Sequence, residues 1–372
     1  MSNPSSSPIK AWVLSLDGGG IRGLSSLMIL ERILSRANKQ PNDAFGLVCG
    51  TSAGGISAIM LGRVGLNIQE CVEEFRELSQ NIFERPRWYS KPRGLLVPKY
   101  KKSTMRYETK ELLKRYGEVM DAMLHGEHPS TERQDHLVPA YVVCVDARPT
   151  GRPKQPTNPV AVCLGTSQSI PYRNGPGVDC AVWEAVRATS AAPTYFRAQK
   201  ITIQGEPMRF LDGAMYYNNP IDTVESVIKH LQLGNWEMEI GYLSIGTGAH
   251  SQEAPVRSYW HIDMIISMSG RIPHTPLRDL RRYLKATGKS MSDLLVDARA
   301  ENAHTVFQRA VPQDRYFRFN CNEELDDGYK LSKTRLDECQ DIHKIVDVTK
   351  KYLENTETKK HLQRCADMLR GI

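Results

Sequence analysis

The sequence lacks the features of several protein classes, and each absence narrows what the chain can be. None of its apolar runs approaches the ~18 residues that a membrane-spanning helix requires. Its eight cysteines include no Cys-x-x-Cys pair, and several lie in apolar, strand-like runs. We therefore expect buried, reduced thiols in a cytosolic protein. Residues 1–10 contain no apolar core, so we do not expect a secretory signal there.

The composition is that of a soluble globular protein. The chain has 372 residues, of which 40% are hydrophobic and 24% are charged. This length suits one large α/β domain or two ordinary ones, and no internal repeat is apparent. The oligomeric state is not indicated.

The net charge of +7 is mild, but the basic residues are concentrated in one stretch. Residues 85–102 contain seven Lys or Arg, no acidic residue, and several interleaved aromatic and aliphatic side chains. This pattern suits a transient contact with an anionic membrane surface, or else a solvated, proline-rich loop. Since no nucleic-acid-binding module is visible, we expect no nucleic acid partner.

Short apolar runs alternate with helical patterns along the chain. Alternation of this kind predicts an α/β fold, with a mainly parallel sheet covered on both faces by helices. The expected strands are 11–16, 45–49, 140–145, 160–164, 209–212, 240–245 and an edge strand at 315–319. The expected helices are 24–34, 56–61, 66–83 with Asn67 as its cap, 104–124, 181–191, 220–231 opened by Asn218-Asn219-Pro220, and 259–309 with a break.

A Gly-x-Ser-x-Gly turn lies between the apolar run at 45–49 and the expected helix at 56–61. Its residues are Gly50, Ser52 and Gly54. A strand that turns at once into a helix strains its middle residue, so the positions two residues before and after it require very small side chains. Ser52 is then either a nucleophile at a helix N-terminus, where unpaired N–H groups favour negative charge, or only the cap of that helix.

A second glycine-rich loop follows the strand expected at 11–16. Consecutive glycines at a strand end can turn several backbone N–H groups into one anion-binding hollow. If the strands at 11–16 and 45–49 are adjacent and parallel, this loop lies beside Ser52, as an oxyanion hole must. Arg22 would add positive charge near the oxyanion or a lipid phosphate, or else form a surface salt bridge. The three glycines are Gly18, Gly19 and Gly20.

The same loop also fits a dinucleotide fingerprint, because Gly18, Gly20 and Gly23 match Gly-x-Gly-x-x-Gly. That fingerprint requires an acidic residue at the end of the second strand, where this chain has Ser52. We therefore expect no nucleotide cofactor. His125-Gly-Glu-His128 lacks the spacing of a metal site and precedes a proline, so we expect no metal either.

The nucleophile needs a base, and two candidates remain open. Asp212 ends an expected strand and is followed by Gly213 and Ala214. It is either a common turn aspartate or a base, and a base requires burial to raise its pKa from the usual ~4. His250, shortly after another expected strand, is the alternative base of a Ser-Asp-His triad.

Taken together, these motifs resemble the patatin-like phospholipase family, above all its fungal and calcium-independent members. Three motifs correspond, and the likeness covers about residues 11–248; Gly46, where many members have aspartate, departs from the pattern. The corresponding stretches are Asp17-Gly-Gly-Gly-Ile-Arg-Gly23, Gly50-Thr-Ser-Ala-Gly54 and Asp212-Gly-Ala214, with further likeness in 183–196 and 218–220.

The resemblance implies a three-layer α/β/α sandwich and a Ser-Asp dyad that acts on acyl esters of glycerolipids without histidine, metal or cofactor. Ser52 would be the nucleophile, Asp212 the base, and the glycine loop with Arg22 the oxyanion site. The expected activity is that of a phospholipase A-type hydrolase, which cleaves the fatty-acyl esters of glycerophospholipids. A lipid transacylase, or an immune-type effector domain with incidental hydrolase activity, is the alternative.

The expected organisation is a flexible N-terminus at 1–10, a patatin-like catalytic domain at 11–248, and a helical extension with an edge strand at 249–372 packed on the same domain. The expected location is cytoplasmic and peripheral at membranes, with a phospholipid or other acyl lipid as substrate.

Overall fold

The computed structural model describes residues 11–84, 99–146, 161–166, 179–193, 195–203, 205–230, 240–248 and 303–371. Residues 1–10, His250, and most of the basic stretch and of the helical pattern at 259–309 lie outside the described residues. No helix in the described part is both long and apolar enough to cross a membrane.

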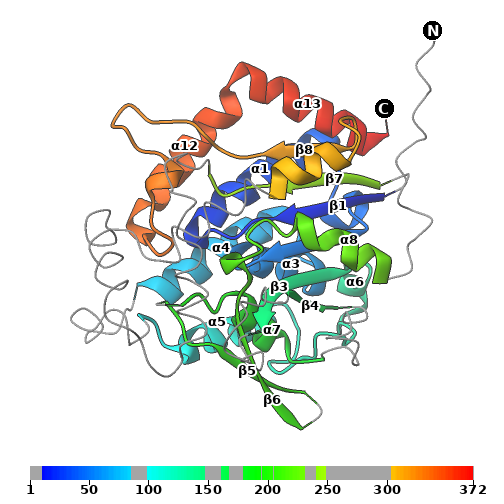
Figure 1. Cartoon of the computed structure of the whole chain (residues 1–372), viewed down its shortest axis with the longest axis vertical. Helices are drawn as coiled ribbons and strands as arrows, with labels where there is room; N and C mark the ends of the chain where they lie inside the picture. The colour runs from blue at the N-terminus through cyan, green and yellow to red at the C-terminus, as the bar shows by residue number, and fades with distance from the viewer. Residues whose placement is uncertain are drawn as a thin grey trace, which may run out of the picture.

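Within these residues, eight strands form one mixed sheet in the order β5-β6-β3-β2-β1-β7-β8, with β4 also paired to β3 (Figure 1). The five strands from β3 to β8 in this order are parallel, whereas β4, β5 and β6 form antiparallel pairs. The strands are β1 Ala11–Leu16, β2 Leu47–Thr51, β3 Ala140–Asp146, β4 Ala161–Gly165, β5 Gln199–Ile203, β6 Glu206–Asp212, β7 Ile240–Ile245 and β8 Tyr316–Phe319.

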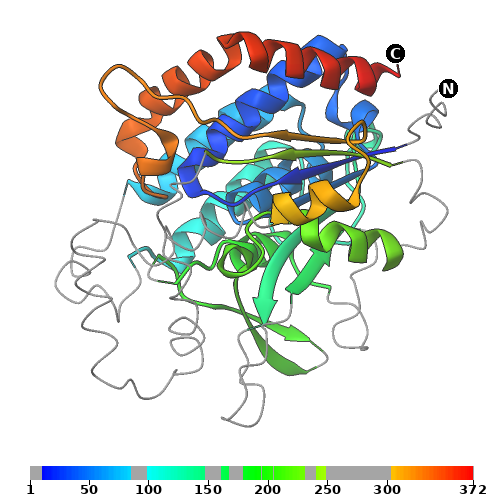
Figure 2. The ribbon, with the colours of Figure 1, turned by 45° about the horizontal axis from the view of Figure 1, so that its top comes forward.

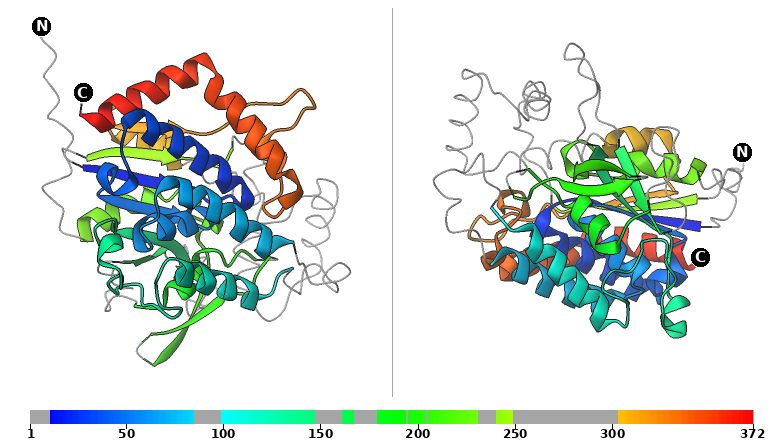
Figure 3. Two further views of the ribbon diagram at one scale, coloured as in Figure 1. Left: turned by 180° about the vertical axis from the view of Figure 1, so that it is seen from behind. Right: turned by 90° about the horizontal axis from the view of Figure 1, so that it is seen from below.

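Helices cover both faces of the sheet, so the fold is a three-layer α/β/α sandwich (Figure 2; Figure 3, right). One face carries α1 with α3, α4, α5 and α7, and the other carries α8 and a helix at 303–310. The helices are α1 Gly23–Ala37, α2 Pro41–Ala44, α3 Ala53–Ala58 continued by a π-helical turn at Ile59–Arg63, α4 Ile68–Phe83, α5 Lys102–Arg115, α6 Thr131–Gln134, α7 Val182–Thr189, α8 Ile221–His230, α12 Ile342–Glu354 and α13 Thr356–Arg370.

The side chains of β1 alternate between two hydrophobic cores. Trp12, Leu14 and Leu16 pack on the face that carries α1, while Val13 packs with the α8 face. This is the period of two that a strand between two helical layers requires. Since both faces are buried, the strand reads in sequence as a continuous apolar run.

One edge of β3 is shared by two strands, and this arrangement positions the site. Thr51, the last residue of β2, pairs with Val143, and Asp212, the last residue of β6, pairs with the next residue, Cys144. The other edge of β3 is occupied by β4, which also pairs at both positions. Therefore β6 takes up the edge where β2 leaves it, and the ends of the two strands meet.

The C-terminal part of the chain completes the sheet and its α1 face. Strand β8 pairs in parallel with β7, and α12 and α13 pack on α1 (Figure 1). From β8, Arg318 forms a buried, two-point ion pair with Asp17 at the end of β1, with N–O distances of 2.8 and 2.6 Å. The same guanidinium also donates to Ser244 of β7.

Several element predictions are confirmed and one is wrong. Asn67 caps α4 by accepting from the Glu70 N–H, and Asn219 opens α8 by accepting from the Ile221 N–H. The helix expected at 104–124 instead ends at Arg115, since Gly117 has a φ of 78° that helical backbone does not allow.

We predict that Arg318→Met lowers the free energy of unfolding by about 3–5 kcal/mol, because it removes a two-point ion pair from a buried carboxylate. Urea denaturation of the full chain measures this loss. Arg364→Met, an exposed arginine on α13, is the matched control and should change stability by less than about 0.5 kcal/mol. Equal effects of the two substitutions would contradict the assignment.

Candidate active site

Ser52 stands on a sharp turn between β2 and α3. Its backbone has φ 54° and ψ −120°, a strained conformation for a residue with a side chain. The turn is tight enough to exclude side chains two residues away on either side. A Cβ on Gly50 would lie 2.1 Å from the Gly54 carbonyl oxygen, and one on Gly54 would lie 2.2 Å from the Leu16 oxygen. The predicted Gly-x-Ser-x-Gly elbow therefore has the geometry that its spacing requires.

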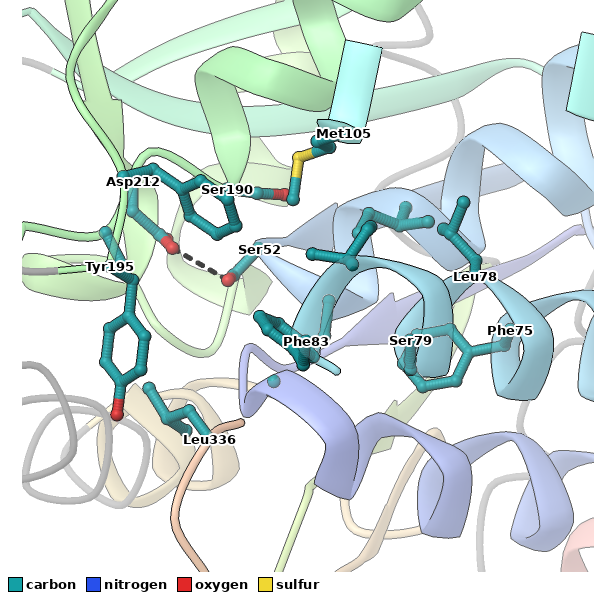
Figure 4. A pocket seen from close by; sticks show the side chains of 16 residues that line it. Ser52, Phe75, Leu78, Ser79, Phe83, Met105, Ser190, Tyr195, Asp212 and Leu336 are labelled. Atoms are coloured by element: carbon teal, nitrogen blue, oxygen red, sulfur yellow. Dashed lines mark hydrogen bonds between the residues drawn. The ribbon is translucent and has the colours of Figure 1, made fainter. Parts of the chain in front are cut away.

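The structure brings Ser52 and Asp212 together. The Ser52 Oγ donates a hydrogen bond of 2.7 Å to the Asp212 Oδ2, although the two residues are 160 positions apart (Figure 4). The other carboxylate oxygen, Oδ1, accepts from the Ala214 N–H at 2.8 Å. Gly213 has no space for a side chain, because a Cβ there would lie 2.4 Å from the Val143 oxygen. The Ala214 N–H thus orients the carboxylate, and Gly213 lets the end of β6 approach β3 closely.

Thr189, at the end of α7, locks the elbow in place. Its hydroxyl accepts from the Ser52 N–H at 2.8 Å and donates to the Val143 oxygen of β3 at 2.7 Å. The sequence predicts no role for Thr189. Its only signal is its position within 183–196, a stretch that resembles the family.

Burial gives Asp212 the proton affinity of a base. Its side chain is almost fully buried, and loss of hydration raises the pKa of its carboxyl to about 7. The hydrogen bonds from Ala214 and Ser52 and the charge of Arg187 oppose this rise in pKa. A carboxylate with a pKa near neutrality is matched to general-base work at neutral pH.

The glycine loop lies beside the elbow, since β1 and β2 are parallel neighbours. Gly20 has φ 56° and lines the same pocket as Ser52. The N–H of Gly18 donates to the Asn218 oxygen and that of Ile21 to the Leu336 oxygen. Within the described part of the chain, the N–H groups of Gly19 and Gly20 donate to no backbone acceptor outside their own helical turn, so they are candidate oxyanion donors.

Arg22 does not lie at the surface, as an exposed salt bridge would require. Its side chain is buried, and it donates to the carbonyl oxygens of Gly19 at 3.3 Å and Leu331 at 3.4 Å. It therefore braces the glycine loop against the segment before α12. Its charge lies behind the loop, at the carbonyl side of the Gly19 peptide.

A mostly apolar pocket is lined by Ser52 and Asp212. It encloses about 490 Å³, counting the part open to solvent. Figure 4 shows its apolar side chains around Ser52, with contributions from α4, α5, the segment after α7, and Leu336. Ser190 also lines it, and within the described residues its buried hydroxyl has no hydrogen-bond partner. The apolar lining comprises Ala53, Ile56, Phe75, Leu78, Ile82, Phe83, Met105, Ala192, Tyr195, Phe196 and Leu336.

No described histidine lines this pocket, and the alternative base His250 lies outside the described residues. The Nδ1 of His125 instead lies 3.6 Å from the Oδ1 of Asp179, and the Nδ1 of His128 accepts from the Ser130 N–H. Among the described residues, no three His, Cys, Asp or Glu side chains gather as metal ligands would. The described site is built on a serine and a carboxylate.

Comparison with known proteins agrees with these motifs. A family model described as patatin-like phospholipase matches residues 14–224. The chain belongs to the patatin-like phospholipase family. Relatives include human calcium-independent phospholipase A2-gamma, 26% identical over 97% of this chain, and the Arabidopsis thaliana phospholipase A I, 24% identical over 85%. The cGAMP-activated phospholipase of Escherichia coli is 32% identical over 56% of the chain.

These relatives are longer proteins. The chain spans 43% of the human protein, 25% of the Arabidopsis protein and 53% of the E. coli protein. Among solved structures, VipD from Legionella pneumophila aligns with a TM-score of 0.38 and 12% identity, covering 92% of this chain and 67% of that one. That likeness carries no further conclusion.

We predict that Asp212 takes up a proton with a midpoint near pH 7, because burial raises its carboxyl pKa to about 7. Carbon-13 NMR of labelled aspartate carboxyls should show a titrating signal that disappears in Asp212→Asn. Since this pKa exceeds the unfolded value of about 4, the Asp212 contribution to stability falls as pH rises from about 4 to 7. A midpoint near 4 would contradict the prediction.

Proposed function

We propose that this protein is a lipid acyl hydrolase of phospholipase A type that works through a Ser52–Asp212 dyad and an acyl-enzyme. The observation that carries the proposal is the 2.7 Å hydrogen bond from the Ser52 hydroxyl to a buried carboxylate at the mouth of an apolar pocket. Membership of the patatin-like phospholipase family supports the substrate class.

In the first half of the reaction, the Ser52 Oγ attacks the ester carbonyl carbon while its proton passes to the Asp212 Oδ2. The oxyanion that forms is stabilised by the N–H groups of Gly19 and Gly20. When the tetrahedral intermediate collapses, the C–O bond to the leaving alcohol breaks, and that alcohol oxygen takes the proton from Asp212. The acyl group remains on Ser52.

In the second half, water attacks the acyl-enzyme and gives its proton to Asp212. Collapse of this intermediate breaks the bond to the Ser52 Oγ, which regains the proton, and the fatty acid leaves. Both protons move through one carboxylate, so its pKa must lie near the working pH. In this scheme neither half requires a metal or an organic cofactor.

The pocket favours a fatty-acyl ester over a small polar one. The side chains around the dyad are aliphatic and aromatic, and an acyl chain loses hydration when it enters such a space. The human and Arabidopsis relatives are named as phospholipases. A phospholipid or another acyl lipid is therefore the proposed substrate.

Transacylation to a lipid or alcohol acceptor uses the same acyl-enzyme and is the second candidate. An effector role is the third, because one relative is named a cGAMP-activated phospholipase. Residues 85–102, with seven basic and no acidic residues, are proposed to draw the protein transiently to anionic membranes from a cytoplasmic location. The segment from 249 onward is proposed to belong to the same domain, since β8 completes its sheet.

We predict that Ser52→Ala lowers the rate of acyl-ester hydrolysis by at least about a thousandfold and that Asp212→Asn lowers it about 10²–10⁴-fold. Release of fatty acid from mixed phospholipid vesicles measures both, and addition of an alcohol acceptor separates hydrolysis from transacylation. Thr305→Ala, which changes a hydroxyl remote from the pocket, is the control. If Asp212→Asn kept near-full activity while a histidine variant lost it, the dyad would be wrong.

The pocket predicts a dependence on acyl-chain length. Leu78 is buried in its wall, so Leu78→Trp should lower kcat/KM for long-chain esters at least about tenfold more than for short-chain esters, as loss of one or two methylene sites in an apolar pocket does. The ratio of the two rates is an internal control, because a folding defect lowers both equally. An unchanged ratio would exclude this pocket as the acyl site.

A further inference from the structure

Ser190 is a buried serine in the wall of the catalytic pocket. It follows α7 directly, is 5% exposed, and lines the same pocket as Ser52 and Asp212. Its backbone is hydrogen-bonded on both sides, since its N–H donates to the Val186 oxygen at 3.2 Å and its own oxygen accepts from the Ala192 N–H at 2.8 Å. The side-chain hydroxyl, in contrast, has no hydrogen-bond partner among the described residues.

Burial of this hydroxyl without a partner is costly. Folding removes its hydration and returns no hydrogen bond. Since most buried polar side chains in proteins are paired, an unpaired one requires an explanation. An alanine at position 190 would fill the wall without this cost. Because Ser190 lines the pocket, we expect the missing partner to be a group of the molecule that binds there.

The residues on either side of Ser190 hold the two members of the dyad. The Thr189 hydroxyl accepts from the Ser52 N–H at 2.8 Å. The Ala191 oxygen accepts from the Asp212 N–H at 3.3 Å. The backbone that positions the nucleophile and the base therefore also positions Ser190, and Figure 4 shows its side chain beside the dyad.

Ser190 and the glycine loop approach the nucleophile from different sides. Figure 4 shows Ser52 between Ser190 and Leu336. Leu336 marks the side of the loop, because a Cβ on Gly20 would lie 2.1 Å from the Leu336 oxygen. A tetrahedral intermediate on Ser52 carries two further oxygens, the oxyanion and the oxygen of the departing alcohol. With the oxyanion at the glycine loop, the side of Ser190 is left to the alcohol oxygen.

The pocket offers few other hydroxyl groups for this oxygen. Apart from Ser52 and Ser190, those that line its described wall belong to Ser79 and Tyr195. Ser79 lies on α4, and in Figure 4 the Tyr195 hydroxyl points away from Ser52. Ser190 is therefore the hydroxyl donor that lies beside the dyad.

We propose that the Ser190 hydroxyl binds the alcohol oxygen of the lipid ester and stabilises it as it leaves the acyl carbon. The inference rests on the dyad proposed above. As the C–O bond breaks, the Ser190 O–H donates a hydrogen bond to the alcohol oxygen, and Asp212 supplies the proton that this oxygen keeps. Ser190 itself neither gains nor loses a proton.

The test compares two esters of the same short acyl chain, a glycerol ester and a nitrophenyl ester, in the parent, Ser190→Ala and Ser190→Thr. The glycerol oxygen leaves as a strong base, so Ser190→Ala should lower kcat/KM for this ester about 10–100-fold. The nitrophenyl oxygen spreads its charge into the ring, so its kcat/KM should fall less than about threefold. Ser190→Thr keeps the hydroxyl and should keep the parent ratio of the two values.

Ser26→Ala is the matched control. Ser26 is a buried serine of α1 that does not line the pocket, and its hydroxyl donates to the Gly246 oxygen at 2.7 Å. This substitution should lower the Tm, because it removes a buried hydrogen bond, and should leave the ratio of the two esters unchanged. Ser190→Ala should change the ratio without lowering the Tm. A fall in Tm equal to that of Ser26→Ala would mean that the Ser190 hydroxyl has a structural partner, and it would overturn the proposal.

The failure of this inference differs from that of the proposed function. If Ser52→Ala left the hydrolysis of both esters unchanged, the dyad would be wrong, and the role of Ser190 would fall with it. If Ser52→Ala abolished hydrolysis while Ser190→Ala lowered kcat/KM equally for both esters, the dyad would stand. The role of Ser190 at the alcohol oxygen would then be rejected.

Discussion

The active site depends on how two strands share one edge of β3. Strand β2 leaves that edge at Val143, and β6 arrives from the opposite direction at Cys144. Because consecutive residues of a strand are about 3.3 Å apart, the ends of β2 and β6 are held at a spacing that one strand defines. The hydroxyl and the carboxylate meet without a flexible loop to join them.

Helix α7 serves both members of the dyad. Thr189 holds the backbone of Ser52 against β3, and the oxygen of Ala191, just beyond the helix, accepts from the Asp212 N–H. The carboxylate is deep enough for burial to raise its pKa, yet it stays hydrogen-bonded to Ala214 and Ser52. Burial thus raises the pKa of the Asp212 carboxyl, and hydrogen bonds from two different segments of the chain lower it.

Much of this site can be predicted from the sequence, because its motifs are local. Gly50 and Gly54 indicate the elbow, and Gly18 to Gly20 indicate the loop, because each group of glycines follows an apolar, strand-like run within a short stretch of sequence. The antiparallel pairing of β3 with β4 is that of the hairpin which the strands expected at 140–145 and 160–164 predict. The sharing of one β3 edge by β2 and β6 depends on register between distant strands and leaves no local signal. The burial of Arg187 and Arg318 likewise leaves no local signal, because an isolated arginine usually lies at the surface.

Leu336 contributes to the site twice. Its carbonyl oxygen accepts the Ile21 N–H and occupies the space where Gly20 would carry a Cβ, while the residue also lines the apolar pocket. A single amino acid therefore fixes both the glycine loop and part of the apolar wall. In the proposed reaction, the position of the acyl chain and that of the oxyanion donors would share this one point of support, which lies more than 120 residues beyond Asp212.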